Sequence, residues 1–137
     1  MGMYTELVLK AEIKEDAPKL VKDILNFLFN AAKEPEEKPG HIFFTKPRWR
    51  YIGSCSSFYH VPFALSRYER NYLFSRSDLK NYDEEIESFI DWLKPYIGCL
   101  SKTCIGWQWY VRKMMLRCFY LHDKGNPPKS PGKLLGG

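Results

Sequence analysis

The chain has 137 residues, of which 45% are hydrophobic and 16% aromatic. This is enough apolar material for one domain with its own core, and too much for intrinsic disorder over most of the length. No apolar run approaches the ~18 residues of a membrane-spanning helix, and the first residues lack the basic start and apolar centre of a signal peptide. We therefore expect a single cytoplasmic domain over residues 1–122 and a flexible Pro- and Gly-rich tail over 123–137.

The first expected elements are a strand over residues 3–13 and a helix after it. Apolar and polar residues alternate along 3–13, which predicts a strand with one buried face. Asp16 is placed to cap a helix, and apolar residues then recur at the three-and-four spacing of a helical stripe as far as Ala32. The polar segment 33–40 has two prolines and a glycine and predicts a surface loop.

Residues 42–80 are rich in aromatic and β-branched side chains, which predicts strands. We expect them over 42–52, 58–68 and 72–79, with the hairpin turn at 69–71. Pro47 and Pro62 cannot donate a hydrogen bond to a neighbouring strand, so each is expected at an edge, a bulge or a strand start.

A second helix is expected after residue 80. Asn81 followed by Glu84 resembles a capping box, and Pro95 and Gly98 mark the end of the helix. Alternation over 105–111 and an apolar run over 114–121 then predict a β-hairpin. The order β-α-β-β-β-α-β-β predicts an α+β fold: a two-layer sandwich with two helices packed on one face of an antiparallel or mixed sheet.

The charge is divided between the expected helices and strands. Residues 1–40 and 81–98 carry net charges of −2 and −4, whereas residues 41–80 and 99–124 carry +5 and +4. Helices on one face of the sheet would leave the cations of the strands on the other face or its rim. A basic sheet face with aromatic rings can bind single-stranded nucleic acid by stacking and phosphate contact, or an acidic protein surface.

We therefore expect a non-enzymatic binding protein that engages nucleic acid or a nucleic-acid-handling protein complex through this face. The residues expected to bind are Arg48, Trp49, Arg50, Arg67, Arg76, Trp107 and Trp109. The alternative is that the aromatic residues belong to the core and the arginines form a solvated rim. The Gly- and Phe-bearing signature strand of the RNA-recognition motif is missing.

Catalytic, metal and cofactor motifs are weak or missing in the sequence. The four cysteines form no C-x-x-C pair, and His41, His60 and His122 are isolated from one another. We therefore expect no metal site and no cofactor. Asp78-Leu79-Lys80 matches a fragment of the acidic-x-Lys signature of restriction-type nucleases.

Two other classes of protein stay open. The first is a small enzyme or a nucleotide or small-ligand binder that acts in a cleft between helices and sheet, using Asp78, Lys80 and a histidine. The second is a structural subunit, which would show a large apolar interface.

Four segments of the chain form a recognisable pattern: Phe43-Phe44 with Pro47-Arg48-Trp49, the run Ile52 to Tyr59, the run Tyr72 to Ile86, and Trp92-Leu93 with Pro95-Tyr96. With them the chain resembles small phage and prophage proteins of unassigned function, over residues 3–110. The resemblance implies a mobile-element origin and a protein that binds and blocks host machinery, including nucleic-acid-targeting defence complexes, in the bacterial cytoplasm. It implies no catalytic residues. After Tyr110 the chain is basic where the pattern in such proteins turns acidic, and one hypothesis is that this segment arose by a change of reading frame.

Overall fold

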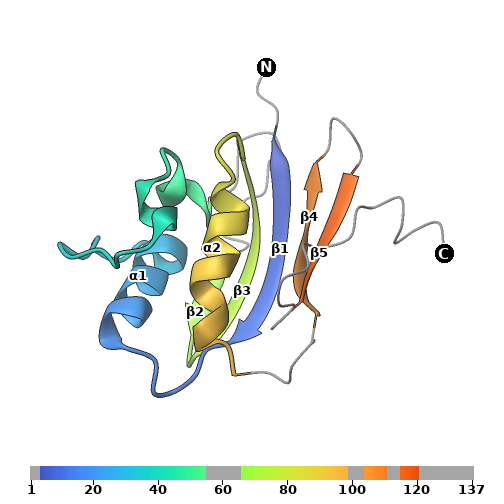
Figure 1. Ribbon diagram of the computed structural model, residues 1–137. Coiled ribbons are helices and arrows are strands. Elements are labelled where there is room, and N and C mark those ends of the chain that lie inside the picture. The colour runs from blue at the N-terminus through green and yellow to red at the C-terminus, as the bar shows by residue number, and fades with distance from the viewer. Residues whose placement is uncertain (1–3, 55–65, 99–103, 111–114, 121–137) are drawn as a thin grey trace.

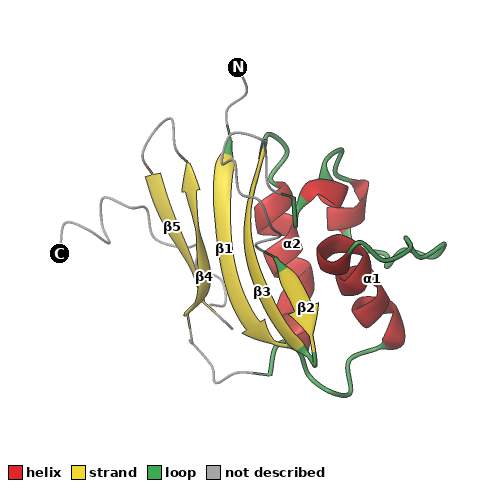
Figure 2. Cartoon of the chain, turned by 180° about the vertical axis from the view of Figure 1, so that it is seen from behind, coloured by secondary structure: helices red, strands yellow, loops and turns green. Residues whose placement is uncertain are grey.

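The computed structural model describes residues 4–54, 66–98, 104–110 and 115–120. Within these ranges two α-helices lie against one five-stranded sheet in which every pairing is antiparallel (Figures 1 and 2). The strands are β1 (Thr5–Glu12), β2 (Arg67–Glu69), β3 (Tyr72–Leu79), β4 (Cys104–Tyr110) and β5 (Met115–Tyr120), in the spatial order β2-β3-β1-β4-β5. The expected α+β class is confirmed.

The strand β1 lies in the middle of the sheet, between β3 and β4. Its side chains alternate as the sequence predicts: Leu7, Leu9 and Ala11 are buried under the helices, whereas Lys10 and Glu12 are exposed on the other side. We call the side of the sheet away from the helices the open face.

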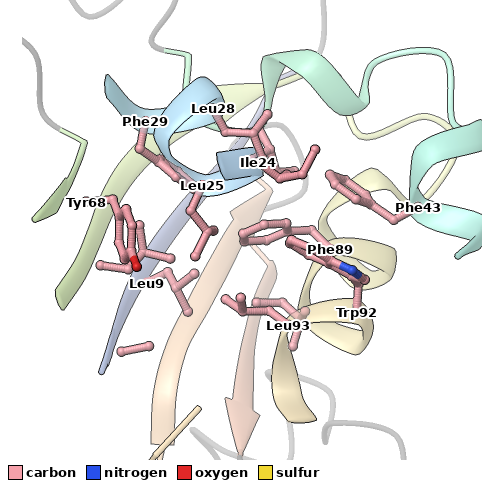
Figure 3. Close-up of a cluster of buried hydrophobic side chains, with 14 of the residues drawn as sticks. Leu9, Ile24, Leu25, Leu28, Phe29, Phe43, Tyr68, Phe89, Trp92 and Leu93 are labelled. Carbon is pink, nitrogen blue, oxygen red and sulfur yellow. The ribbon is translucent and has the colours of Figure 1, made fainter. Parts of the chain in front are cut away.

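The helices α1 (Lys19–Asn30) and α2 (Glu85–Leu93) lie on the same side of the sheet, nearer to β2 and β3 than to β5 (Figures 1 and 2). Each turns one apolar stripe inward. Figure 3 shows Ile24 and Leu28 of α1 approaching Phe43, Phe89 and Trp92. Phe43 packs tilted against Phe89, with 5.3 Å between the ring centroids, and stacks on Trp92 at 6.0 Å.

The helix starts differ in detail from the sequence expectation. Asp16 does not cap α1, because the residue at the N-cap is Pro18 and no side chain bonds there. The capping box expected from Asn81 and Glu84 does not form, because the N-cap of α2 is Glu84 and its side chain makes no cap hydrogen bond. Asn81 Oδ1 instead accepts a hydrogen bond of 2.8 Å from the backbone N–H of Ile86, and the Glu85 carboxylate accepts one from the N–H of Asp83.

The expected strand over 42–52 is wrong. These residues form two 3₁₀ turns, Ile42–Thr45 and Trp49–Tyr51, within the helix layer. The buried side chains here are Phe43, Trp49 and Ile52, at multiples of three residues, which suits a 3₁₀ turn and not a strand of period two. Tertiary packing of these aromatic residues between the helices overrides their β propensity.

The two β-hairpins form as expected. The turn between β2 and β3 falls at Arg70 and Asn71, both with positive φ, as a two-residue hairpin turn requires. The strand β4 pairs with β5, which confirms the second hairpin. Most of the strand expected over 58–68, with Pro62, and the flexible tail expected over 123–137 lie outside the described residues. No helix in the described ranges is long and apolar enough to cross a membrane.

Candidate binding surface on the open face of the sheet

Trp49 does not lie on the open face, which corrects the sequence expectation. Its side chain is only 3% exposed and sits in the helix layer. It packs against Phe27, Phe43 and Phe44, with centroid distances of 5.8, 5.8 and 5.0 Å. Because a buried ring cannot stack on a ligand, Trp49 belongs to the core.

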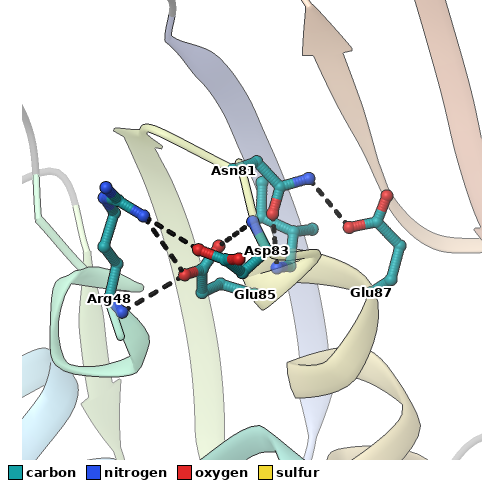
Figure 4. A network of polar contacts seen from close by, with 6 residues as sticks. Arg48, Asn81, Asp83, Glu85 and Glu87 are labelled. Atoms are coloured by element: carbon teal, nitrogen blue, oxygen red, sulfur yellow. Dashed lines mark hydrogen bonds and ion pairs between the residues drawn. The ribbon is translucent and has the colours of Figure 1, made fainter. Parts of the chain in front are cut away.

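Arg48 also lies in the helix layer, where it links two segments of that layer. Its guanidinium donates to Asp83 over 3.0 Å and lies 3.9 Å from Glu85, and its backbone N–H donates to Glu85 Oε2 over 3.2 Å (Figure 4). The guanidinium also sits 5.0 Å from the ring centroid of Tyr82. These contacts tie the 3₁₀ segment to the start of α2.

Arg50 has a partner in the loop after α1. It donates two hydrogen bonds to the carboxylate of Glu34, of 2.5 and 3.1 Å, and its guanidinium lies 4.7 Å from the ring centroid of Trp49. The hydrogen bonds from Arg50, with further help from Lys38, lower the pKa of Glu34 to about 2. Arg48 and Arg50 are therefore remote from the open face, since both belong to the helix layer.

Arg67 and Arg76 are the two predicted binding arginines that reach the open face. Arg67 on β2 forms an ion pair of 2.9 Å with Glu69, and Arg76 on β3 lies 3.7 Å from Glu6. Both guanidinium groups are exposed, and surface ion pairs contribute only about 0–1 kcal/mol, so both can exchange their partners for a ligand.

Trp107 and Trp109 are in β4, where their backbones pair with Val8 and Glu6 of β1. Their side chains lie outside the described part of the structure.

The open face presents two exposed aromatic rings that the sequence expectation did not select. Tyr72 and Phe74 are 62% and 49% exposed, next to each other on the same face of β3. Leu73, Ser75 and Ser77 alternate with these rings and are buried, so β3 turns the two rings outward. The sequence carries no local signal for this, because Tyr72-Leu73-Phe74 is a continuous apolar run and the residues buried after it are serines.

Phe74 is flanked by a cation on each side. It pairs with Arg67 across β2 and with Lys10 across β1, and all three residues are exposed. Directly opposed residues have Cβ atoms about 4.5–5.5 Å apart, so the two cations border the ring. We call Arg67, Phe74 and Lys10 the basic row. Arg76 follows Phe74 on the same face of β3.

Tyr72 is flanked by carboxylates in the same way. It pairs with Glu69 on β2 and Glu12 on β1, both exposed. We call Glu69, Tyr72 and Glu12 the acidic row. Over its described side chains the open face thus carries both signs, because Glu12 and Glu69 lie beside the cations expected there. Alternation along β1 places Glu12 on this face, and the pairing of β2 with β3 brings Glu69 beside Tyr72.

A cleft of about 340 Å³ lies at the end of β3 where the strand meets the 3₁₀ segment. Its described lining is formed by Tyr4, Arg48, Tyr51, Ser54, Asp78, Leu79 and Lys80. Asp78 is almost fully buried, and the Lys80 ammonium lies 5.8 Å from the ring centroid of Tyr4. His41 is elsewhere, hydrogen-bonded to Asp91, and His60 and His122 lie outside the described residues.

Among the described residues, no group of three or more histidine, cysteine or acidic side chains is placed to hold a metal ion. A scan against protein-family models and searches of curated proteins and of solved structures each find no significant match to this chain.

Proposed function

We propose that this protein is a non-enzymatic binding protein that engages single-stranded nucleic acid through the open face of its sheet. The observation that carries the proposal is the basic row, in which the exposed ring of Phe74 stands between Arg67 and Lys10.

The arrangement matches the two contacts that a single strand offers. A base stacked on an exposed aromatic ring contributes about 1–3 kcal/mol, and the cations beside the ring are placed for the phosphates. Tyr72 and Phe74 are two residues apart on β3, or roughly 7 Å at the usual rise per residue. Two successive bases of an extended strand can therefore stack on the two rings.

The resemblance to small phage and prophage proteins supports a related form of the proposal. In that form the protein acts in a bacterial host cytoplasm, and its partner is a host protein complex that itself handles nucleic acid. We favour direct binding of nucleic acid because stacking uses flat exposed rings with cations beside them, as the basic row presents.

The proposal is tested with fluorescently labelled single- and double-stranded DNA and RNA, by anisotropy over a salt series. Phe74→Ala should weaken binding of single strands about tenfold, which corresponds to the loss of one stacked base. Ile42→Ala is the matched control, because Ile42 is a large exposed apolar residue in the helix layer. Binding should weaken as salt rises. The slope of the logarithm of the affinity against the logarithm of the salt concentration should be smaller for Arg67→Gln than for the unchanged protein.

The absence of binding to any nucleic acid at low salt would contradict this form of the proposal. A protein partner would then be sought by capture from the host, with the Phe74→Ala and Ile42→Ala variants compared. If Phe74→Ala and Ile42→Ala had equal effects on nucleic-acid binding and on capture of a protein partner, the open face would not be the binding surface.

The cleft at the end of β3 favours a second candidate function, a nucleotide or small-ligand binder or a small enzyme. Its lining contains Asp78 and Lys80, which the sequence had marked for this class. Hydrolysis of a nucleotide panel in the presence of Mg²⁺, abolished by Lys80→Ala but unaffected by Phe74→Ala, would support it over the binding protein.

A further inference from the structure

The acidic row places hydrogen-bond acceptors on both sides of the second exposed ring. Tyr72 pairs directly with Glu12 and Glu69, and all three side chains point away from the helices into solvent. A ligand ring that stacks on Tyr72 therefore meets carboxylates along its edges. The carboxylates of the acidic row repel phosphates, so attraction of phosphates does not explain this row.

The two carboxylates are not equivalent. Glu69 forms the 2.9 Å ion pair with Arg67, which occupies part of its accepting capacity. In the described part of the structure the carboxylate of Glu12 forms neither an ion pair nor a hydrogen bond, whereas its backbone oxygen accepts from the N–H of Gly98. Glu12 is thus the acceptor most available to a ligand.

Ionised carboxylates accept hydrogen bonds and cannot donate them. Among the bases, cytosine, adenine and guanine carry exocyclic amino groups that donate, and a carboxylate accepting from the N4 amino group of cytosine is an established pairing in recognition. Uracil and thymine have carbonyl oxygens in place of the amino group, and these oxygens are repelled by a carboxylate. The basic row beside it has the opposite character and suits phosphates.

We propose that the acidic row makes the open face selective for bases with an exocyclic amino group, with Glu12 as the main specificity-determining residue and Glu69 as the second. The inference rests on the proposed function, because it names which nucleic acids the same face prefers. In this arrangement Arg67 and Lys10 hold the backbone of the strand, Phe74 stacks on one base, and the acidic row distinguishes the base on Tyr72.

The test compares labelled oligocytidine with oligouridine of the same length, using the full chain and anisotropy at fixed salt. Both bases are pyrimidines, so the comparison changes the edge of the base more than its stacking surface. We expect a preference for oligocytidine of about five- to tenfold, the range of one good base-edge contact. Glu12→Gln should reduce this preference to less than about twofold, because an amide group donates to uracil as well as accepting from cytosine.

A charge-matched control is needed, because removing a negative charge strengthens binding to any nucleic acid. Glu36→Gln removes one carboxylate from the exposed loop after α1 and should leave the preference unchanged. The ratio of the two affinities is therefore the decisive quantity. Thermal unfolding of both variants, expected within a few degrees of the unchanged protein, shows that each is folded.

The possible results separate the two proposals. Binding that is lost in Phe74→Ala but is equal for the two oligomers would overturn the base preference and leave the proposed function standing. A preference that persists in Glu12→Gln and in Glu12→Gln/Glu69→Gln would also overturn it. Failure of every oligomer to bind would overturn both.

Discussion

The carboxylate of Glu85 lies 3.2 Å from the backbone nitrogen of Arg48 and is fully buried. Its other oxygen accepts a hydrogen bond of 3.1 Å from the N–H of Asp83 (Figure 4). One acidic side chain therefore joins the start of α2 to a 3₁₀ segment that the sequence pattern had predicted as a strand. The basic side chain of Arg48 serves the same junction.

Glu85→Ala should destabilise the protein by about 2–4 kcal/mol, because two backbone N–H groups lose a charged acceptor in a buried site. The loss is measured by urea unfolding, where the free energy of unfolding should fall with urea concentration at the same slope in both proteins. Glu84→Gln is the control, since Glu84 is exposed and its side chain makes no cap hydrogen bond. A change of less than about 1 kcal/mol in Glu85→Ala would mean that the junction is not held by this carboxylate.

Trp49→Ala should cost about 3–5 kcal/mol of stability, the usual range for a large aromatic removed from a core. Trp49→Phe keeps most of the packing, so it should bind single-stranded nucleic acid within about twofold of the unchanged protein, since Trp49 lies away from the open face. Phe74→Ala should show the reverse behaviour: a small effect on unfolding and a large one on binding. Loss of binding in a folded Trp49→Phe protein would contradict the placement of Trp49.

Ala31→Gly should stabilise the protein. Ala31 ends α1 in the left-handed conformation, with φ of 56°, where a β-carbon is unfavourable and glycine is preferred. The gain should be up to about 1 kcal/mol, seen as a rise in Tm of a few degrees. Ala32→Gly is the control: Ala32 has no positive φ, so the extra freedom of the unfolded chain should lower Tm. A fall in Tm for Ala31→Gly would show that the left-handed cap is not strained.

Gly53→Ala should destabilise the protein by about 1–3 kcal/mol, the usual cost of overpacking. A methyl group at Gly53 would collide with the backbone oxygen of Leu28 and lie 2.8 Å from the ring of Phe29. At Gly40 the added methyl group meets no atom within 4 Å, so Gly40→Ala should be neutral or slightly stabilising. The two variants are compared by their Tm values in thermal unfolding. Equal stability of the two would show that the loop before residue 54 can move away from α1.

The stability of the protein should depend on pH through Glu34. Its pKa in the folded protein is about 2, below the ordinary value of 4.5, chiefly because Arg50 donates hydrogen bonds to the ionised carboxylate. A carboxyl group with a lowered pKa stabilises the fold above its ordinary value, and this contribution is lost as the pH falls from 4.5 towards 2.

Because Glu34 is partly exposed, its contribution should be no more than about 1 kcal/mol. In urea unfolding between pH 7 and pH 3, Glu34→Gln should be less stable than the unchanged protein at pH 7, and the two should converge at low pH. A difference that stays constant over this range would contradict the assignment.

The local sequence pattern was sufficient to predict most of the helices and strands, since each of them buries one face and exposes the other. The strand over 72–79 follows from composition, the turn at 69–71 from its residue types and the second hairpin from alternation, and the structure confirms all three. The helix stripes follow in the same way from their period. These signals act within a few residues, so the sequence displays them directly.

The residues of the candidate binding surface were predicted less well, because this surface depends on which strands lie side by side. The helices are determined by the sequence through the spacing of apolar residues, and the strand 72–79 through its aromatic-rich composition. Only the tertiary structure decided that Trp49 enters the core and that Arg48 and Arg50 pair with acids of the helix layer. It alone also set Lys10 and Arg67 beside Phe74. Contacts across tens of residues arise from packing and strand register, and no local period encodes them.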